Sequence, residues 1–231
     1  MDLRRPFGVV LVASLILASC DIPRDPEKTL DKVSGGTMQV GLWENDPWTT
    51  LAGDDPGGVE VELVEDFAES LDAEIEWFQG SEEDLIGALE MRELDLVIGG
   101  LTSRSTAQAT FTHPYITTFV AIGVPEGTDP DLDIEGVEVS VEAGTEEAGL
   151  LRKTDAKVVT VDDIATATGP RVVDDWLLDD LDLVDTGIRL SEADHVMAVP
   201  HGENAWLTKL ERFLLEDPGA VRDLLEREGA S

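Results

Sequence analysis

The chain has 231 residues, 42% of them apolar, which is enough for one or two compact domains with hydrophobic cores and excludes a disordered acidic chain. Its 50 acidic and 16 basic residues give a formal net charge of −34. This charge argues against nucleic acid or an anionic membrane surface as a partner, since both would repel the protein.

The first residues have the pattern of a secretory signal peptide. Arg4 and Arg5 form a basic start, and the apolar run 7–17 is shorter than the roughly 20 residues that cross a bilayer. The motif Leu-Ala-Ser-Cys that follows resembles a bacterial lipobox and contains the single cysteine, Cys20. The resemblance implies a lipoprotein that loses residues 1–19 and carries lipid, such as palmitate, on Cys20. An ordinary signal sequence with a chance cysteine is the alternative.

Residues 20–36 are predicted to form a tether between this anchor and the folded part. They are polar, contain Pro23 and Pro26, and lack apolar periodicity.

The next part of the chain predicts a β-α-β-α-β unit. An alternating strand pattern at 38–43 ends at "ENDPW", and two glycines precede a helix that runs to residue 71 with one apolar face. A strand at 73–78, a helix from Ser81, and a short buried strand at 94–100 follow. This order is typical of a parallel sheet covered by helices.

A second α/β unit follows, and the chain then returns to a helical tail. Strand patterns are found at 116–124, 136–145, 156–161 and 195–200, a short strand passes into a helix over 171–181, and two helices are expected at 203–215 and 220–228. Two units joined by extended segments near 120–126 and 193–200 would leave a cleft between them, and ligands of open α/β sheets bind outside the carboxyl ends of the strands.

The order and spacing of these segments resemble those of a known family, the extracellular solute-binding proteins of ABC importers, family 3, which bind polar amino acids. The segments that carry the resemblance cover nearly all of residues 36–215: "GTMQVGLWENDPW", "GGVEVELVEDFAESLDAEIEWF", "LIGALEMRELDLVIGGLTSR", "FTHPY", "GVEVSVEAGT", "RVVDDWLL" and "HVMAVPHGENAWLTKLERFL". The resemblance implies an α/β fold of the two-lobed periplasmic-binding-protein type 2, with a hinge of two crossing strands. Lobe I would comprise 37–125 and 194–231, and lobe II 126–193.

The same resemblance implies a function. The exported, lipid-anchored protein would face the periplasm or the cell exterior as a monomer. It would capture a small solute, an amino acid or related carboxylate, and pass it to the permease and ATPase of an ABC importer. The sequence contains no Gly-x-Ser-x-Gly motif and no phosphate-binding glycine loop, so no enzyme activity, cofactor or metal is expected.

Arg104 is the candidate clamp for a solute carboxylate. Arginine offers a bidentate, charge-assisted donor, and small hydroxyl residues, Thr102 among them, surround it. In the resembling family an arginine follows such a stretch ahead of a motif that "FTHPY" matches. Here the intervening loop is about two residues short, which leaves Ser105 as the alternative occupant of that position. A surface arginine paired with an acid is the other alternative.

Two candidate contacts lie in lobe II. Gly144 and Thr145 follow a strand and open a helix, where backbone N–H groups favour an anion, and the resemblance implies a second contact to the solute carboxylate. A plain N-cap is the alternative. Asp174, beside Asp175, stands where the family carries an acid that pairs with an ammonium group, and a solvated pair of acids is the alternative.

Trp43 and Trp48 flank the loop after the first strand and could stack on a solute or bind a cation. Packing at the lobe edge is the alternative, and it is favoured more for Trp43 than for Trp48. Glu44 and Asn45 could add polar contacts.

The sequence leaves two other functions open. One is a secreted dehydratase on the same fold, for which Glu142 or Glu146 would be the general acid. The other is a sensory or structural lipoprotein that has lost its ligand. The three histidines lack the spacing of metal ligands.

Overall fold

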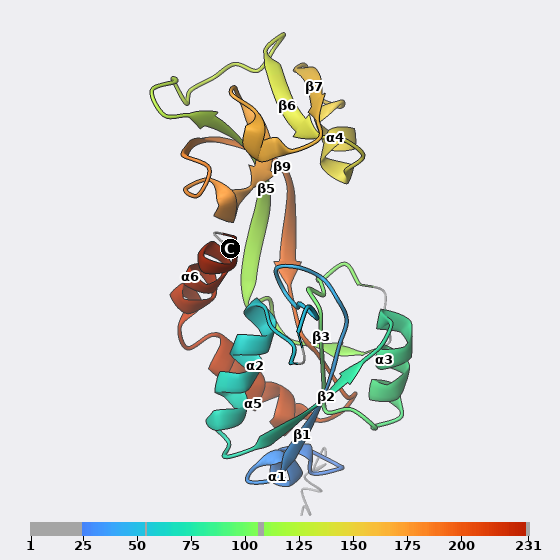
Figure 1. Ribbon diagram of the computed structural model, residues 1–231. Coiled ribbons are helices and arrows are strands. Elements are labelled where there is room, and N and C mark those ends of the chain that lie inside the picture. Colours follow the sequence, from blue (N-terminus) through green and yellow to red (C-terminus); the bar gives the residue numbers. More distant parts are fainter. Residues whose placement is uncertain (1–24, 54, 106–108, 230–231) are drawn as a thin grey trace, which may run out of the picture.

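The computed structural model describes residues 25–53, 55–105 and 109–229, which form two β-sheets with helices around them (Figure 1). The predicted signal peptide, the lipid-bearing Cys20 and the first part of the tether lie outside the described residues. Among the helices that are described, none combines the length and the apolar character needed to cross a bilayer.

The first lobe contains a five-stranded sheet in the order β2-β1-β3-β10-β4. The strands are β1 (Thr37–Leu42), β2 (Glu74–Gln79), β3 (Leu96–Ile98), β4 (Thr110–Phe111) and β10 (Ala198–Val199). Strands β1, β2 and β3 run parallel, and β10 runs antiparallel to β3 and β4. The carboxyl ends of the three parallel strands therefore meet at one edge of the sheet.

Helices cover both faces of this sheet, as Figure 1 shows. They are α1 (Thr29–Val33), α2 (Val59–Glu69), α3 (Glu82–Glu90), α5 (Asn204–Leu214) and α6 (Pro218–Gly229). In β3, Leu96 and Ile98 pack in the core formed with α2, α5 and α6, while Val97 packs in the core formed with α3. Because β3 is buried on both faces, it has a continuous apolar sequence rather than an alternating one.

The second lobe contains the sheet β7-β6-β8-β5-β9. Its elements are β5 (Ile116–Pro125), β6 (Glu138–Glu142), α4 (Glu146–Leu151), β7 (Lys157–Val161), β8 (Arg171–Asp174) and β9 (Leu183–His195), with single 3₁₀ turns η1 (Ile164–Thr166) and η2 (Asp175–Leu177). The predicted helix after β8 is thus only the turn η2, because Trp176 is drawn into the core and the chain soon turns back into β9.

Two long strands connect the lobes. Strands β5 and β9 pair antiparallel from Ile116↔His195 to Pro125↔Leu183, and both extend from the first lobe to the second (Figure 1). This is the pair of crossing strands that the sequence predicts. Both strands extend into both lobes, so they do not mark a single residue as the boundary between the lobes. The predicted boundaries at 125/126 and 193/194 therefore stay predictions.

The C-terminal helix α6 contacts both sides of this connection. Val221 and Leu225 are buried in the core of the first lobe, which Trp176 of η2 also joins. The Arg222 guanidinium lies 2.9 Å from Asp175 Oδ2, at the start of η2. Helix α6 therefore links the body of the first lobe to the segment that follows β8.

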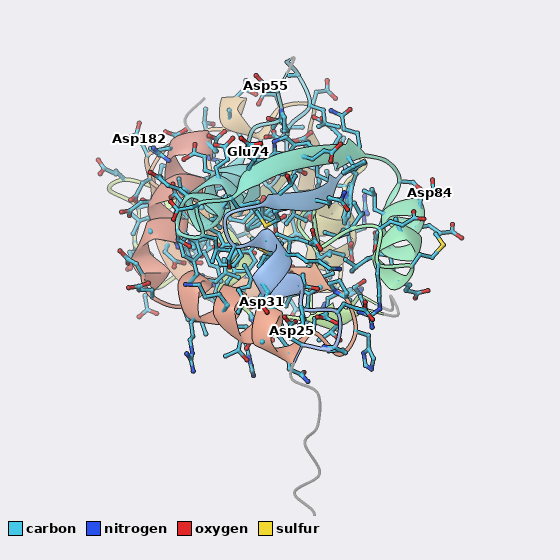
Figure 2. All side chains as sticks on the ribbon, turned by 90° about the horizontal axis from the view of Figure 1, so that it is seen from below. Asp25, Asp31, Asp55, Glu74, Asp84 and Asp182 are labelled. Carbon is cyan, nitrogen blue, oxygen red and sulfur yellow. The ribbon has the colours of Figure 1, made fainter. Side chains whose placement is uncertain are left out.

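Acidic side chains are spread over the surface rather than gathered at one place. Asp55, Asp84 and Asp182 are exposed on separate segments and lie at the rim of the molecule in Figure 2. This distribution fits a solvated surface.

A pair of leucines tests the packing of α6. Leu225 is fully buried, whereas Leu215 is 46% exposed. We expect Leu225→Ala to lower the free energy of unfolding by about 2–5 kcal/mol, and Leu215→Ala to change it by less than about 0.5 kcal/mol. Urea denaturation with an unchanged m-value measures both, and equal losses would contradict the described packing.

Candidate functional site

The first lobe has a pocket of about 260 Å³ at the carboxyl ends of β1 and β3. Its lining includes Trp43, Asn45, Glu82, Gly99, Thr102 and Arg104. This is the edge at which open parallel sheets bind ligands. The pocket brings together Trp43, Thr102 and Arg104, and also Asn45, which the sequence offered as an additional polar contact.

Two glycines follow β3, at positions where side chains of the loop after β1 lie against the backbone. Gly99 and Gly100 have φ of 145° and 70°. A Cβ on Gly99 would lie 2.4 Å from the Trp43 ring, and one on Gly100 would lie 2.5 Å from the Asn45 amide nitrogen. That amide donates a 2.8 Å hydrogen bond to the Gly99 carbonyl. The apolar strand thus ends in glycines so that the loop after β1 can pack over it.

Arg104 lies on a tight turn attached to β9. The Ser105 N–H donates to the Thr102 carbonyl at 2.8 Å, Ser103 N–H donates to the Asp194 carbonyl at 2.8 Å, and Thr102 forms a β-bridge with His195. The Arg104 side chain is exposed, and in the described part of the chain no acid forms an ion pair with it. Its guanidinium is therefore available to a solute carboxylate. Ser105 lines the same pocket.

The two loop tryptophans have exchanged the roles favoured from the sequence. Trp43 lines the pocket, whereas Trp48 is 5% exposed. The Trp48 ring stacks on His195, with 3.8 Å between ring centroids, and meets Trp176 edge-on at 6.1 Å. Trp48 therefore packs beneath the pocket rather than lining it, because the loop after β1 doubles back through the Asn45–Thr49 hydrogen bonds.

The second lobe has its own pocket, of about 220 Å³, at the carboxyl ends of the parallel strands β6 and β8. Three acids line it together with Thr145: Glu142, Glu147 and Asp174. Within the described ranges, no three histidine, cysteine or acidic side chains are grouped to hold a metal ion. Because three acids line it, the second-lobe pocket has an acidic lining.

Gly144 and Thr145 form the turn into α4. Gly144 has φ 85°, and the Thr145 hydroxyl accepts from Ala148 N–H at 3.3 Å and donates to the Glu142 carbonyl at 2.9 Å. Thr145 is thus an N-cap. Glu146 and Glu147 occupy the first turn of this short helix, so their charges oppose a second carboxylate there.

Asp174 and Asp175 have separate roles. Asp175 accepts from Phe119 N–H at 2.9 Å and pairs with Arg222. Asp174 lines the pocket, and burial, followed by the charges of Glu147 and Asp175, raises its pKa to about 7. A cation in the pocket would oppose this shift, because a nearby positive charge favours the ionised carboxylate.

Glu60 is a buried acid that the sequence reasoning missed. Its side chain is inaccessible to solvent, and burial raises its pKa to about 7 against the lowering effect of three hydrogen bonds. Its spacing to Val64 and Phe67 places it on the apolar face of α2. An acid among the apolar positions of the helical pattern was the sequence signal that could have predicted a buried carboxyl group.

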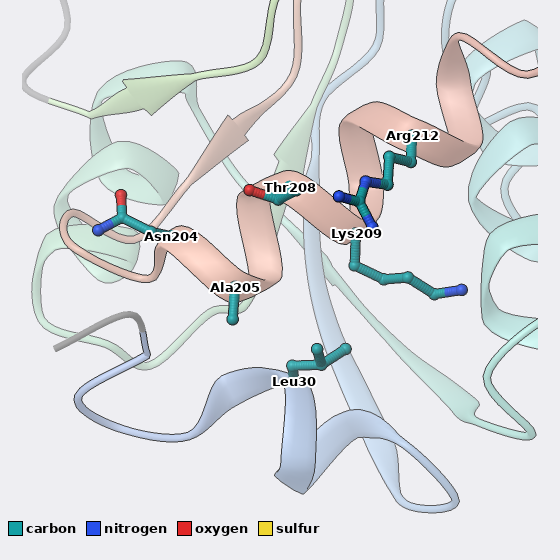
Figure 3. Close-up of a pocket in the computed structure, with 6 residues that line it drawn as sticks. All are labelled: Leu30, Asn204, Ala205, Thr208, Lys209 and Arg212. Carbon is teal, nitrogen blue, oxygen red and sulfur yellow. The ribbon is translucent and has the colours of Figure 1, made fainter.

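The largest of these pockets, about 460 Å³, lies elsewhere. It is formed between α1 and α5, where Leu30 faces Thr208, Lys209 and Arg212 (Figure 3). It is away from the carboxyl edge of the sheet, and no residue predicted for the solute site lines it. We therefore place the candidate site at the two smaller pockets.

Solved structures of other proteins share this fold. The L-cystine solute receptor of Neisseria gonorrhoeae, in its unliganded open conformation, matches with a TM-score of 0.69 at 18% identity, over 87% of this chain and 97% of that one. An ancestral cationic amino acid solute-binding protein matches with a TM-score of 0.65 at 21% identity, over 86% and 98%. They confirm the predicted two-lobed periplasmic-binding-protein fold.

The family model of the bacterial extracellular solute-binding proteins, family 3, matches residues 38–217. The chain therefore belongs to this family, whose members bind small-molecule solutes outside the cytoplasm. Curated relatives match in part. The membrane-bound lytic murein transglycosylase F of Vibrio parahaemolyticus is 32% identical over 107 residues, which is 45% of this chain and 20% of that protein. The match thus spans about a fifth of the length of this relative.

The raised pKa of Asp174 predicts a stability cost at high pH. A carboxyl group whose folded-state pKa is raised binds its proton more tightly when folded, so stability falls as pH rises from about 3.8 to about 7. Asp174→Asn should therefore stabilise the unliganded protein at pH 8 by on the order of 1–3 kcal/mol, and by less as pH falls toward 4.

Chemical denaturation at pH 4, 6 and 8 measures this effect. Asp155→Asn is the matched control, because Asp155 is an exposed acid of the same lobe. A pH-independent gain in Asp174→Asn, or the same gain in the control, would contradict the electrostatic explanation.

Proposed function

We propose that this protein captures an amino acid between its two lobes and delivers it to an ABC importer. One observation carries the proposal: the first-lobe pocket offers a guanidinium beside a single acid, Glu82, whereas the charged residues that line the second-lobe pocket are all acids. Arg104 stands on the first lobe without an ion pair among the described residues, and Asp174 stands on the second lobe with Glu142 and Glu147. An α-carboxylate fits the guanidinium, and an ammonium group fits Asp174.

The composition of the second-lobe pocket favours a cationic amino acid. One carboxylate is enough for an α-ammonium group, yet three acids line this pocket. A second positive charge on the solute would be attracted by the remaining two, whereas an acidic side chain would be repelled. The ancestral binding protein with a similar fold is also described as a binder of cationic amino acids.

The mechanism is capture by closure rather than chemistry. Each lobe holds only one part of the charge pattern, so the solute binds fully when both lobes contact it. A ligand shifts a conformational equilibrium by its differential affinity for the two states. The solute therefore stabilises the closed arrangement, with β5 and β9 as the hinge.

The lipobox supports the cellular setting. Lipid on Cys20 would hold the protein at the outer face of a membrane, and the polar residues after it would let the lobes reach a permease. A folded domain that meets its transporter in this way needs no transmembrane helix of its own.

Screening of solutes tests the proposal. We expect isothermal titration calorimetry and thermal shift to give affinities in the order cationic, then neutral, then acidic amino acids. A bound solute raises the midpoint of unfolding by mass action. Preference for acidic amino acids would contradict the charge argument, and binding to none of the common amino acids would contradict the proposal.

Arg104→Ala tests the clamp. Loss of a charge-assisted hydrogen bond should weaken binding by about 10- to 100-fold. Arg212→Ala is the matched control, since Arg212 is an exposed arginine on α5 of the same lobe, and its affinity should equal that of the wild type. Ser105→Ala addresses the alternative occupant. An unchanged affinity in Arg104→Ala would contradict the proposed contact between Arg104 and the solute carboxylate.

A second candidate function has one observation in its favour. A general acid works best with a pKa near the operating pH, and the pKa of Asp174, in a pocket shared with Glu142, is about 7. A structure with a TM-score of 0.65 and 18% identity is described as an ancestral cyclohexadienyl dehydratase. Release of water from a cyclic dienyl carboxylic acid, followed by NMR and lost in Asp174→Asn, would favour this function over binding alone.

A further inference from the structure

Glu60 contacts the ligand loop and the start of the hinge at once. We use ligand loop for residues 99–104. Glu60 Oε2 accepts from Gly99 N–H at 2.6 Å and from Gly100 N–H at 2.9 Å, and Oε1 accepts from the Tyr115 hydroxyl at 2.5 Å. Tyr115 directly precedes the first residue of β5. One buried carboxylate thus joins α2, the end of β3 and the hinge.

The ligand loop is held from its other side by the second hinge strand. Val196 N–H donates to the Leu101 carbonyl at 2.9 Å, and Thr102 forms a bridge with His195 at the end of β9. Tyr115 N–H donates to the His195 carbonyl at 3.0 Å. The loop that carries Arg104 is therefore bonded to Glu60 on one side and to the end of β9 on the other, and the start of β5 is bonded to both Glu60 and His195.

A carboxylate suits this position better than any neutral side chain. Three donors converge on Glu60, two of them consecutive backbone N–H groups on one oxygen. Hydrogen bonds to an ionised acceptor are about twice as strong as those between neutral groups. Gly99 and Gly100 follow the last residue of β3, and their N–H groups donate to Glu60 instead of to a neighbouring strand. The acid therefore supplies the hydrogen-bond acceptor that these buried N–H groups need, and it holds the backbone of the loop in place.

We propose that Glu60 is a positioning residue for solute capture, which fixes the ligand loop and, through Tyr115, couples the position of that loop to hinge strand β5. Glu60 is buried below the pocket and acts through the loop rather than by touching the solute. The inference rests on the proposed function, because it assigns Glu60 a role at that same site.

Above the pKa of Glu60, which is about 7, Glu60→Gln removes the charge with little change in size, so the measurements below are made at pH 8.5. A matched control exists in Glu203→Gln, because the Glu203 side chain is also fully buried in the first lobe. Glu203 accepts from Glu27 N–H, Thr29 and Arg92, away from the ligand loop. Comparison of the two variants separates loss of a buried carboxylate from loss of the loop contact.

Hydrogen–deuterium exchange of the unliganded proteins is the first measurement, and it needs no solute. We expect Glu60→Gln to speed exchange about tenfold or more at residues 99–104 and 116–119, since one charge-assisted hydrogen bond corresponds to about that factor. Glu203→Gln should leave both segments as in the wild type. Unchanged exchange at 99–104 in Glu60→Gln would overturn the proposal.

Tyr115→Phe tests the coupling by itself. It removes the hydroxyl that links Glu60 to β5 and leaves the bonds to Gly99 and Gly100 in place. Exchange should rise at 116–119 and stay unchanged at 99–100. An unchanged rate at 116–119 would overturn the coupling.

Titration with L-arginine is the second measurement. Glu60→Gln should bind about tenfold more weakly than the wild type, and Glu203→Gln should bind equally well. If the wild type itself binds no L-arginine, the preference for cationic solutes fails, while the exchange data still decide the role of Glu60. Equal affinity of Glu60→Gln and wild type would overturn the role in capture.

Discussion

The antiparallel pairing of β5 with β9 is the constraint on which the rest of the structure depends. These strands carry the chain from one lobe to the other and back, from Ile116↔His195 to Pro125↔Leu183. The turn that presents Arg104 is bonded to the end of β9, and β8, which ends in Asp174, pairs with β5. The two segments that carry the candidate site are therefore both attached to this strand pair, so the distance between them depends on the geometry of β5 and β9.

Arg104 and Asp174 differ from most other charged residues of the protein in their surroundings. In a chain with a formal charge of −34, an arginine with acids nearby would ordinarily pair with one of them. Arg222 and Arg189 do so, with Asp175 and Asp185. The structure instead keeps Arg104 unpaired among the described residues, and it keeps Asp174 in a pocket that raises the pKa of its carboxyl group. Charged groups in such unfavourable surroundings are common at functional sites.

Much of the fold could be predicted from local patterns, and the failures have physical causes. Helix and strand order followed from periodicity, whereas Arg104, Thr102 and Asp174 were singled out by their chemistry together with the resemblance to the family. Residues 183–192 of β9 were missed because a half-exposed hinge strand with Gly187 and several acids does not show the apolar alternation of a core strand. The buried partner role of Glu60 could not be predicted, since its donors lie about 40 and 55 residues away in sequence.

The C-terminal helix has a consequence for how the chain folds. Val33, near the start of the described chain, and Leu225, near its end, lie in one core. A domain in which residues far apart in sequence pack into one core has a high contact order, and such domains fold slowly. The first lobe can therefore complete its core only after α6 has been synthesised, whereas the strands of the second lobe are contiguous in the chain and are all available earlier.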